Sequence, residues 1–496
     1  MKNNIRITAL LTALLLLTVS FAACSGGDNN EGAVSADTSS AAETTAEETT
    51  GGYLPDGLGS DIDFGSAKVT ILVRTDVYDT EFYVPEESGE VVDDAIFNRN
   101  LAVEERMGVV LEYLHTEGDA NHSGVLTGAI RNSVLAADGA YDIAAVLSNQ
   151  LPKLALEGLL LNLNDLPYLD FEKPWWANGL IDELAVGGRL YFASGDASLG
   201  VIRDMMCIFF NKQTAEEYAL PDLYELVSSG KWTFDLLMKY IKGTYRDLDG
   251  DGVRSGTDAY GYAFGDPNQI YGYIEAFDLR IVERDAEGYP SKLVFGSERV
   301  TDAHALLIEM TTNNPDFSVD SWNTRPYMDT FREGKILFIN GQFKDTSMYR
   351  EIESFDFGVI PMPKLEESQE EYGTCVRATY SSFCVPKTAK DPDMAAAVLE
   401  CCASESYRKV SPAYYETALK VKYSRDDESA KVFDLIKESV KFSFGISFGY
   451  SFGDPQNSFK GTLMIDYKGW QSFYASWEPS ASIKLAQTVE TLRSLN

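Results

Sequence analysis

The sequence predicts an α/β fold that contains a parallel sheet with helices on both of its faces. Segments of strand and helix character alternate from the first apolar strand onward, and that βαβαβ order is typical of parallel sheets. About 440 of the 496 residues remain after the N-terminal segments, which is enough for two or three domains with sizeable cores. The expected elements are a strand at Lys68–Val73, a helix from Asp93 to about Met107, a strand at Val109–His115, a helix at Val125–Ala137 and a strand at Tyr141–Leu147.

The N-terminus has the features of a secretory signal peptide that spans residues 1–23. Lys2 and Arg6 precede the apolar run Ile7–Ala23, and small residues end that run before Cys24. A cysteine at this point resembles a bacterial lipobox, so we expect Cys24 to be lipidated and to hold the protein on the outer face of the cell membrane. Ordinary secretion with a free Cys24 is the alternative. No later stretch is apolar for long enough to span a bilayer.

Residues 24–60 are expected to form a disordered tether. Ser25–Gly52 consists almost entirely of small, polar and acidic residues and has no apolar face with which to form a core. A flexible chain of that length has a root-mean-square span of roughly 30 Å. The tether would therefore keep a folded body close to a membrane surface.

Composition excludes several classes of function. The formal net charge of −34 argues against nucleic acid or anionic lipid as the main partner. The five cysteines after Cys24 show no C-x-x-C spacing, so they indicate neither a disulfide framework nor a zinc site. Cys375 and Cys384 could pair, or both could be apolar core thiols.

The second half of the chain continues the alternation of strands and helices. Strands are expected at Met206–Phe210, Tyr260–Phe264, Lys335–Ile339 and Phe355–Ile360. Helices are expected from Phe234 to about Thr244, at Asp393–Ser404, at Asp427–Lys441 and at Ile483–Leu495.

An acidic loop from Asp247 to Asp258 matches the calcium-binding loop of an EF-hand. Aspartates occupy positions 1, 3, 5 and 12, and Gly252 at position 6 permits the sharp turn. The expected ligands of a structural Ca²⁺ ion are Asp247, Asp249, Asp251, Val253, Ser255 and Asp258. The alternative is an acidic surface turn that binds nothing. Because a strand is expected after the loop instead of a second helix, we interpret it as a fixed clamp.

Several patches in a shared order resemble those of family 1 extracellular solute-binding proteins, the lipid-anchored receptors of bacterial carbohydrate ABC transporters, similar to maltose-binding protein. The most specific patches are Phe210-Asn211-Lys212 followed by Gly230-Lys231-Trp232-Thr233-Phe234. Further patches are Asp93–Asn100, Tyr141-Asp142-Ile143, Leu156–Leu160, Trp175-Trp176, Phe331–Lys335 and Pro361–Lys364. The resemblance implies a two-lobe periplasmic-binding-protein fold of type II, with interleaved lobes joined by a hinge and the ligand between them. Lobe one would comprise residues 61–190 and 375–412, and lobe two residues 191–364 and 413–496.

Candidate ligand-binding residues come from two sources. Arg74, Asp76 and Asn149 follow the first and third strands, and ligands of parallel sheets bind at the carboxyl ends of the strands. The resemblance adds residues on the first lobe, near the hinge, along the second lobe and on the segment that returns to the first lobe. These are Trp175, Trp176, Asp196, Asp266, Asn268, Tyr271, Gln342, Phe343 and Tyr380. We expect at least one of the adjacent tryptophans to be partly exposed, and core packing of both is the alternative.

Motifs for catalysis are weak. The pattern G-x-S-x-G occurs twice between Gly445 and Gly453, but both matches come from one Ser-Phe-Gly repetition, and no histidine follows the serines. A flexible aromatic loop near the mouth of the cleft is the expected structure there.

The sequence therefore predicts a monomeric receptor without enzymatic activity, which captures a carbohydrate and delivers it to an ABC transporter permease. The alternatives are a peptide receptor or a surface glycosidase that uses two carboxylates.

Overall fold

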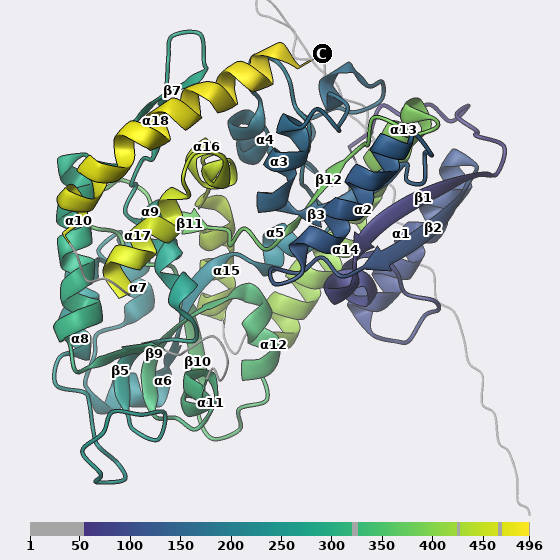
Figure 1. Cartoon of the computed structure of the whole chain (residues 1–496). Helices are drawn as coiled ribbons and strands as arrows, with labels where there is room; N and C mark the ends of the chain where they lie inside the picture. Colours follow the sequence, from purple (N-terminus) through teal and green to yellow (C-terminus); the bar gives the residue numbers. More distant parts are fainter. Residues whose placement is uncertain (1–53, 320–325, 424–426, 465–468, 496) are drawn as a thin grey trace, which may run out of the picture. The chain divides into compact units, whose positions relative to one another are not determined.

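A computed structural model describes residues 54–319, 326–423, 427–464 and 469–495 of the protein (Figure 1). The predicted signal peptide, Cys24 and most of the predicted tether lie outside these residues. No helix in the described part of the chain is long and apolar enough to cross a membrane.

The first sheet has the strand order β12-β3-β1-β2. The strands β1 (Ala67–Arg74), β2 (Val109–Thr116) and β3 (Ile143–Leu147) are parallel, and β12 (Ser381–Cys384) is antiparallel to β3. All five residues of β3 are buried, as expected for a strand covered on both faces. The predicted βαβαβ unit is thus confirmed, and a strand from more than 200 residues later in the chain completes the sheet.

The second sheet has the order β10-β4-β9-β5-β8. It consists of β4 (Met206–Asn211), β5 (Tyr260–Phe264), β8 (Phe317–Val319), β9 (Ile336–Gln342) and β10 (Phe357–Ile360). All of these strands except the short β8 were predicted, and β5 covers the predicted residues without change. Two small sheets pair β6 (Val282–Arg284) with β7 (Pro290–Leu293), and β11 (Thr374–Cys375) with β13 (Val440–Lys441).

Two chain segments that connect the main sheets run side by side in opposite directions. Antiparallel bridges join Ala193 to Phe383 and Met205 to Val376. Residues 193–205 lead from the first sheet toward β4, and residues 376–383 lead back to β12. The chain is therefore interleaved between the two sheets, as the resemblance implies. The exact lobe boundaries stay a prediction.

Helices pack around both sheets (Figure 1). Those closest in sequence to the first sheet are α1 (Val91–Met107), α2 (Ser123–Ala136), α3 (Leu151–Leu156), α4 (Asn178–Leu184), α13 (Pro392–Arg408) and α14 (Val410–Pro412). The remaining helices are α5 (Gly200–Arg203), α6 (Lys212–Glu217), α7 (Leu223–Ser228), α8 (Phe234–Ile241), α9 (Gly272–Ala276), α10 (Glu298–Ile308), α11 (Pro326–Arg332), α12 (Thr346–Tyr349), α15 (Asp427–Glu438), α16 (Phe444–Ser447), α17 (Pro455–Met464) and α18 (Trp470–Ser494).

The first long helix, α1, ends as predicted but begins earlier. Gly108 ends α1 in the left-handed conformation, as predicted. The helix begins at Val91 and not at Asp93, because the carboxylate of Asp94 accepts hydrogen bonds from the backbone N–H groups of Ser88 and Gly89 and so closes the preceding turn.

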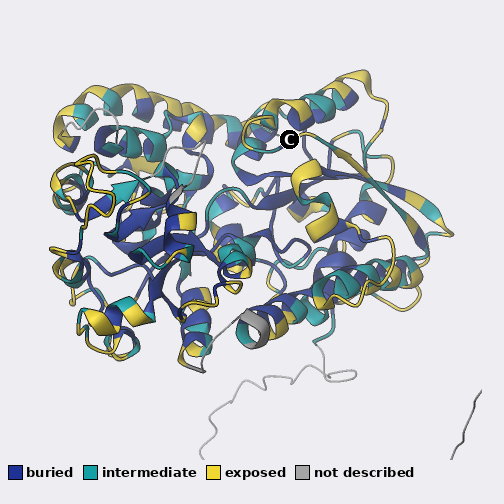
Figure 2. Cartoon of the chain, turned by 90° about the horizontal axis from the view of Figure 1, so that it is seen from below, coloured by how far each residue is buried: buried dark blue, intermediate teal, exposed yellow. Residues whose placement is uncertain are grey.

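The core is apolar and continuous, with buried strands inside and helices that expose only their outer sides (Figure 2). The five cysteines after Cys24 are all buried and free, so Cys375 and Cys384 are core thiols.

Two segments have bounds that differ from the predicted ones, and one contact was not predicted. The end of the predicted tether, from residue 54 onward, is described and contains the buried residue Asp56. The last helix begins at Trp470 and not at Ile483, and it runs through Pro479. Its final turn contacts the predicted first lobe, because Arg189 Nη1 donates to the carbonyl of Leu492 at 3.1 Å.

The segment with the two G-x-S-x-G matches is also not a flexible loop. It forms α16 and a short 3-10 helix, and Phe444, Phe448 and Phe452 are buried. The ring of Phe444 stacks on that of Phe448 at a centroid distance of 4.5 Å and an interplanar angle of 10°. Burial of these rings at a spacing of four residues outweighs the low helix propensity of the intervening glycines and serines.

Candidate functional site

Asp204 lies at the centre of a polar network between the two main sheets. It lies two residues before β4, and its carboxylate is almost fully buried. The carboxylate accepts hydrogen bonds from Lys344 Nζ at 2.7 Å, from Gln342 Nε2 at 3.2 Å and from Thr379 Oγ1 at 2.5 Å. Gln342 ends β9 of the second sheet, whereas Thr379 lies on the segment that returns to the first sheet. Asp204 therefore joins elements of both sheets.

A buried ion pair extends this network toward the carboxyl end of β5. Arg377 Nη1 lies 2.8 Å from Asp266 Oδ2, and the two side chains are 10% and 2% exposed. The backbone N–H of Arg377 also donates to the carbonyl of Asp204 at 3.0 Å. Charge-assisted pairs of this kind hold a carboxylate in a fixed orientation.

The first sheet contributes a second arginine–carboxylate pair. Arg74, the last residue of β1, is buried and donates to both carboxylate oxygens of Asp76, at 3.1 and 3.0 Å. Its Nη1 donates to the carbonyl of Thr379 at 2.7 Å. We call Arg74, Asp76, Asp204, Asp266, Gln342, Lys344, Arg377 and Thr379 the interlobe network.

A buried carboxylate adjoins the interlobe network. Glu81 accepts a hydrogen bond from Ser198 Oγ at 2.5 Å, and its Oε1 lies 3.6 Å from Arg203 Nη1. Burial raises the pKa of Glu81, although the nearby guanidinium groups of Arg203 and Arg74 oppose that effect.

Tyr271 and Asn268 lie on the 3-10 helix Pro267–Tyr271 that follows Asp266. The Tyr271 hydroxyl donates to Asn457 Oδ1 at 2.5 Å, and Lys460 Nζ donates to Asn268 Oδ1 at 2.7 Å. Lys460 Nζ also lies 5.4 Å from the centroid of the Tyr271 ring. The predicted polar and aromatic side of the second lobe thus continues into α17, which sequence reasoning had not connected with it.

Besides the two tryptophans, four predicted site residues lie outside this arrangement. Phe343 is fully buried, with its ring edge-on to Phe433, and Tyr380 is buried edge-on to Phe442. Asn149 accepts a hydrogen bond from Gln150 Nε2. Asp196 lies on the first of the two connecting segments, as predicted for a hinge carboxylate, and burial raises its pKa to about 7. A role of these residues in ligand binding stays a prediction.

The adjacent tryptophans Trp175 and Trp176 are both buried, so the expectation of partial exposure is wrong. Both indole N–H groups donate to the carboxylate of Glu400 on α13, each at 2.9 Å. One buried acceptor therefore satisfies two neighbouring donors and lets both rings enter the core. This arrangement favours the packing role.

We expect Glu400→Gln to change the pH dependence of stability. Burial raises the pKa of Glu400 to about 7, although three N–H donors favour the charged form. A carboxyl whose pKa is higher in the folded than in the unfolded state stabilises the fold most below about pH 4.5, and that contribution is lost as the pH rises through about 7. Urea unfolding measures the free energy of unfolding at pH 5.5 and at pH 8. Between these two pH values, the free energy of unfolding of the wild type should fall by about 1–3 kcal/mol more than that of the variant. An equal loss in both proteins would contradict the assignment.

Sequence reasoning missed Asp204, Lys344, Arg377, Glu81 and Lys460. Asp204 lies two residues before β4, and Arg377 lies two residues after β11. The short strand β11 beside Arg377 was not predicted, so no signal in the sequence placed Arg377 at a strand end.

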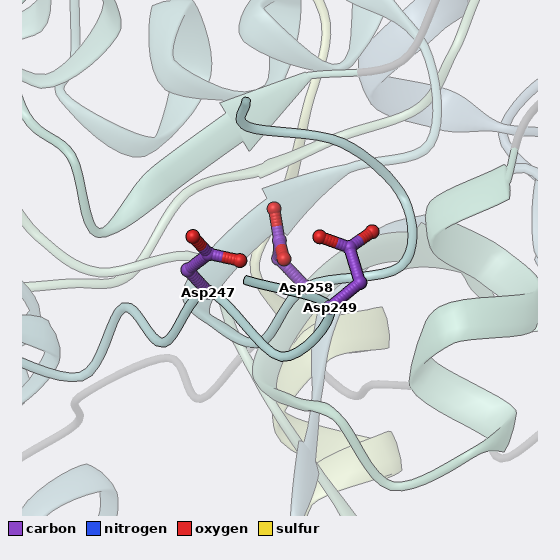
Figure 3. Close-up of side chains that lie close together, drawn as sticks. All are labelled: Asp247, Asp249 and Asp258. Atoms are coloured by element: carbon purple, nitrogen blue, oxygen red, sulfur yellow. The ribbon is translucent and has the colours of Figure 1, made fainter. Parts of the chain in front are cut away.

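The acidic loop between α8 and β5 brings together three of its predicted metal ligands. Each of Asp247, Asp249 and Asp258 offers one carboxylate oxygen, and these atoms lie within 4.8 Å of one another on the same side of the loop (Figure 3). Asp258 is buried and accepts from the backbone N–H groups of Leu248 and Ser255. The carboxylate of Asp251 instead accepts from the N–H of Val253.

Comparisons with known proteins agree with this architecture. A family model described as bacterial extracellular solute-binding protein matches residues 126–409. No curated protein matches the chain in sequence.

Three solved structures show the same two-lobe fold at low sequence identity. UgpB from Mycobacterium tuberculosis, in complex with glycerophosphocholine, has a TM-score of 0.57 at 13% identity, over 86% of this chain and 100% of that chain. The GacH receptor of Streptomyces glaucescens, solved unliganded and with acarbose, has a TM-score of 0.52 at 14% identity, over 87% and 100%. MalE from Bdellovibrio bacteriovorus, bound to maltotriose, has a TM-score of 0.52 at 13% identity, over 86% and 100%.

The matched residues include β3, the whole second sheet and both connecting segments. The family is extracellular, which places the protein outside the cytoplasm. The chain belongs to the bacterial extracellular solute-binding proteins.

Proposed function

We propose that the protein captures an oligosaccharide between its two lobes and delivers it to the permease of an ABC transporter, without changing it chemically. The lipidated Cys24 would hold the receptor on the outer face of the cell membrane. Binding would select a closed arrangement of the lobes, because only that arrangement contacts both sides of the ligand.

The interlobe network is the observation that carries this proposal. Its carboxylates come from both sheets and from the connecting segments, and arginine or lysine holds each of them in place. Carboxylates in fixed orientations accept hydrogen bonds from sugar hydroxyls, and Tyr271 adds an aromatic side chain close to them. The GacH and MalE structures, which hold acarbose and maltotriose, support the ligand class.

Calorimetry with a glycan panel tests the proposal. The panel contains malto-, cello-, xylo- and manno-oligosaccharides from dimers to hexamers. We expect saturable binding of one glycan per protein, weakened about tenfold or more in Asp204→Asn, which loses a charged acceptor. Asp302→Asn, a substitution of an exposed residue on α10, is the matched control.

Other outcomes identify the alternatives. Binding of peptides but of no glycan would indicate a peptide receptor, and binding of glycerophosphocholine alone would indicate a ligand of the kind seen with UgpB. Release of shorter products from a bound glycan would indicate a glycosidase.

We also propose that the acidic loop binds a structural Ca²⁺ ion. Three carboxylates this close together repel one another, and a hard divalent cation with oxygen ligands offsets that repulsion. The ion would stabilise the connection between α8 and β5 without a part in ligand binding.

Calcium is then expected to raise the melting temperature. An ion that binds only the folded state adds about 2.7 kcal/mol of stability at 100 times its Kd. Differential scanning calorimetry should give a higher melting temperature with CaCl₂ than with EDTA. This difference in melting temperature should be absent in Asp249→Ala and retained in Asp302→Ala. Identical curves with CaCl₂ and with EDTA would refute the site.

A further inference from the structure

An aromatic pocket lies on the first lobe, beside the interlobe network. It has a volume of about 500 Å³ and is lined by Tyr78, Tyr113, His115 and Tyr141 together with apolar side chains of β1, β2 and α2. The parallel strands β1 and β2 end side by side there, with Arg74 opposite Thr116. Ligands of such sheets bind at this edge, and the volume is within the usual range of small-molecule sites.

The Tyr78 ring at the pocket contacts two other aromatic rings, those of His115, which also lines the pocket, and Tyr83, which does not. The ring of Tyr78 lies 4.3 Å from that of His115 and 5.5 Å from that of Tyr83, with interplanar angles of 32° and 24°. A hydrogen bond of 3.1 Å between Thr75 Oγ1 and His115 Nδ1 fixes the His115 ring. His115 and Tyr83 are exposed, so this group of rings is accessible from solvent.

The polar groups beside these rings are acidic. The Asp76 side chain is 39% exposed, while the nearly buried Arg74 holds its carboxylate. Burial raises the pKa of Tyr78, and the charge of Asp79 adds to that effect. Phosphate or carboxylate ligands are therefore disfavoured, whereas hydroxyl groups find an acceptor in a fixed orientation.

We propose that this pocket binds a terminal sugar unit of the oligosaccharide, so that the ligand extends from the interlobe network across the carboxyl ends of β1 and β2. This inference rests on the proposed function. A pyranose ring combines an apolar face, which suits the aromatic rings, with hydroxyls, which suit Asp76. All lining residues belong to the first lobe, so a long glycan can dock there before the lobes close.

The test compares glycans of increasing length by calorimetry in the wild type, Tyr78→Leu, Tyr78→Phe and His115→Ala. We expect Tyr78→Leu and His115→Ala to weaken binding of the longest glycans about tenfold and to leave the shortest unchanged. Tyr78→Phe, which keeps the ring, should retain most of the affinity. His122→Ala, which alters another exposed histidine of the first lobe, is the control for His115→Ala.

The outcomes separate this inference from the proposed function. Equal losses at every length, or no loss at any length, would overturn the subsite while leaving the receptor function intact. Binding of choline or glycerophosphocholine that depends on Tyr78 would overturn the choice of a sugar. If the wild type binds no glycan, the proposed function fails and the subsite fails with it. Because His115 is exposed, its variant gives a readout even if Tyr78→Leu unfolds.

Discussion

Replacing Asp266 with alanine is expected to lower the free energy of unfolding by about 3–5 kcal/mol, because the change removes the carboxylate that faces the buried guanidinium of Arg377. Removal of one partner from a buried ion pair leaves a charge that is poorly solvated and poorly compensated. The carboxylate of Asp266 also accepts from the N–H of Asn268 at 2.9 Å, so the start of the 3-10 helix loses its cap as well. Urea unfolding at neutral pH measures the loss.

Two further variants make this expectation specific. Asp329→Ala removes one partner of an exposed pair with Arg332, whose side chains are 70% and 38% exposed, and should cost about 0–1 kcal/mol. The double variant Asp266→Leu/Arg377→Met replaces both charges by apolar groups, and it should be more stable than Asp266→Ala. Equal losses in Asp266→Ala and Asp329→Ala would show that the pair between Asp266 and Arg377 is not effectively buried.

The same pair shows why sequence reasoning found half of the interlobe network. Asp266 directly follows a predicted strand, and residues at the carboxyl ends of strands are natural candidates. Its partner Arg377 lies 111 residues later, and Thr379 lies 305 residues from Arg74. Which charges meet across such separations depends on the chain's return from the second sheet to the first. Local periodicity carries no information about that return.

Local signals predicted most strands and several helices well. In β5, aromatic residues alternate with small ones, which is typical of a strand. All residues of β3 are apolar, which predicts a strand of a parallel sheet that is buried on both faces. The predictions fail where side chains are buried on a helix although the residues have a low helix propensity. Pro479 lies inside α18, and glycine and serine separate the stacked phenylalanines of α16 and the residues after it. In both places aromatic packing outweighs the cost of poor helix formers.

The connection between the predicted tether and the folded body depends on Asp56. Asp56 is 5% exposed, accepts from Ser404 Oγ at 2.7 Å, and lies 2.9 Å from Arg106 Nη2 and 3.0 Å from Arg408 Nη1. These arginines belong to α1 and α13, which pack against each other. A surface pocket of about 590 Å³ lies beside the three charged groups. One carboxylate therefore attaches residues 54–59 to two helices of the first lobe.

Asp56→Ala is expected to lower the free energy of unfolding by about 3 kcal/mol at pH 7 and to expose residues 54–59 to proteases. Burial would raise the pKa of Asp56, but the Ser404 hydroxyl and the charges of Arg106 and Arg408 hold it below its usual value of 3.8. A carboxyl with a lowered pKa stabilises the fold above the unfolded-state value, and the contribution is lost as the pH falls through the folded-state value. The stability difference between wild type and variant should therefore shrink below about pH 4. Asp61→Ala, which changes an exposed aspartate close by, is the control and should leave both stability and proteolysis unchanged. A difference for Asp56→Ala that persists unchanged at pH 3 would show that packing of the segment, and not its charge, provides the attachment.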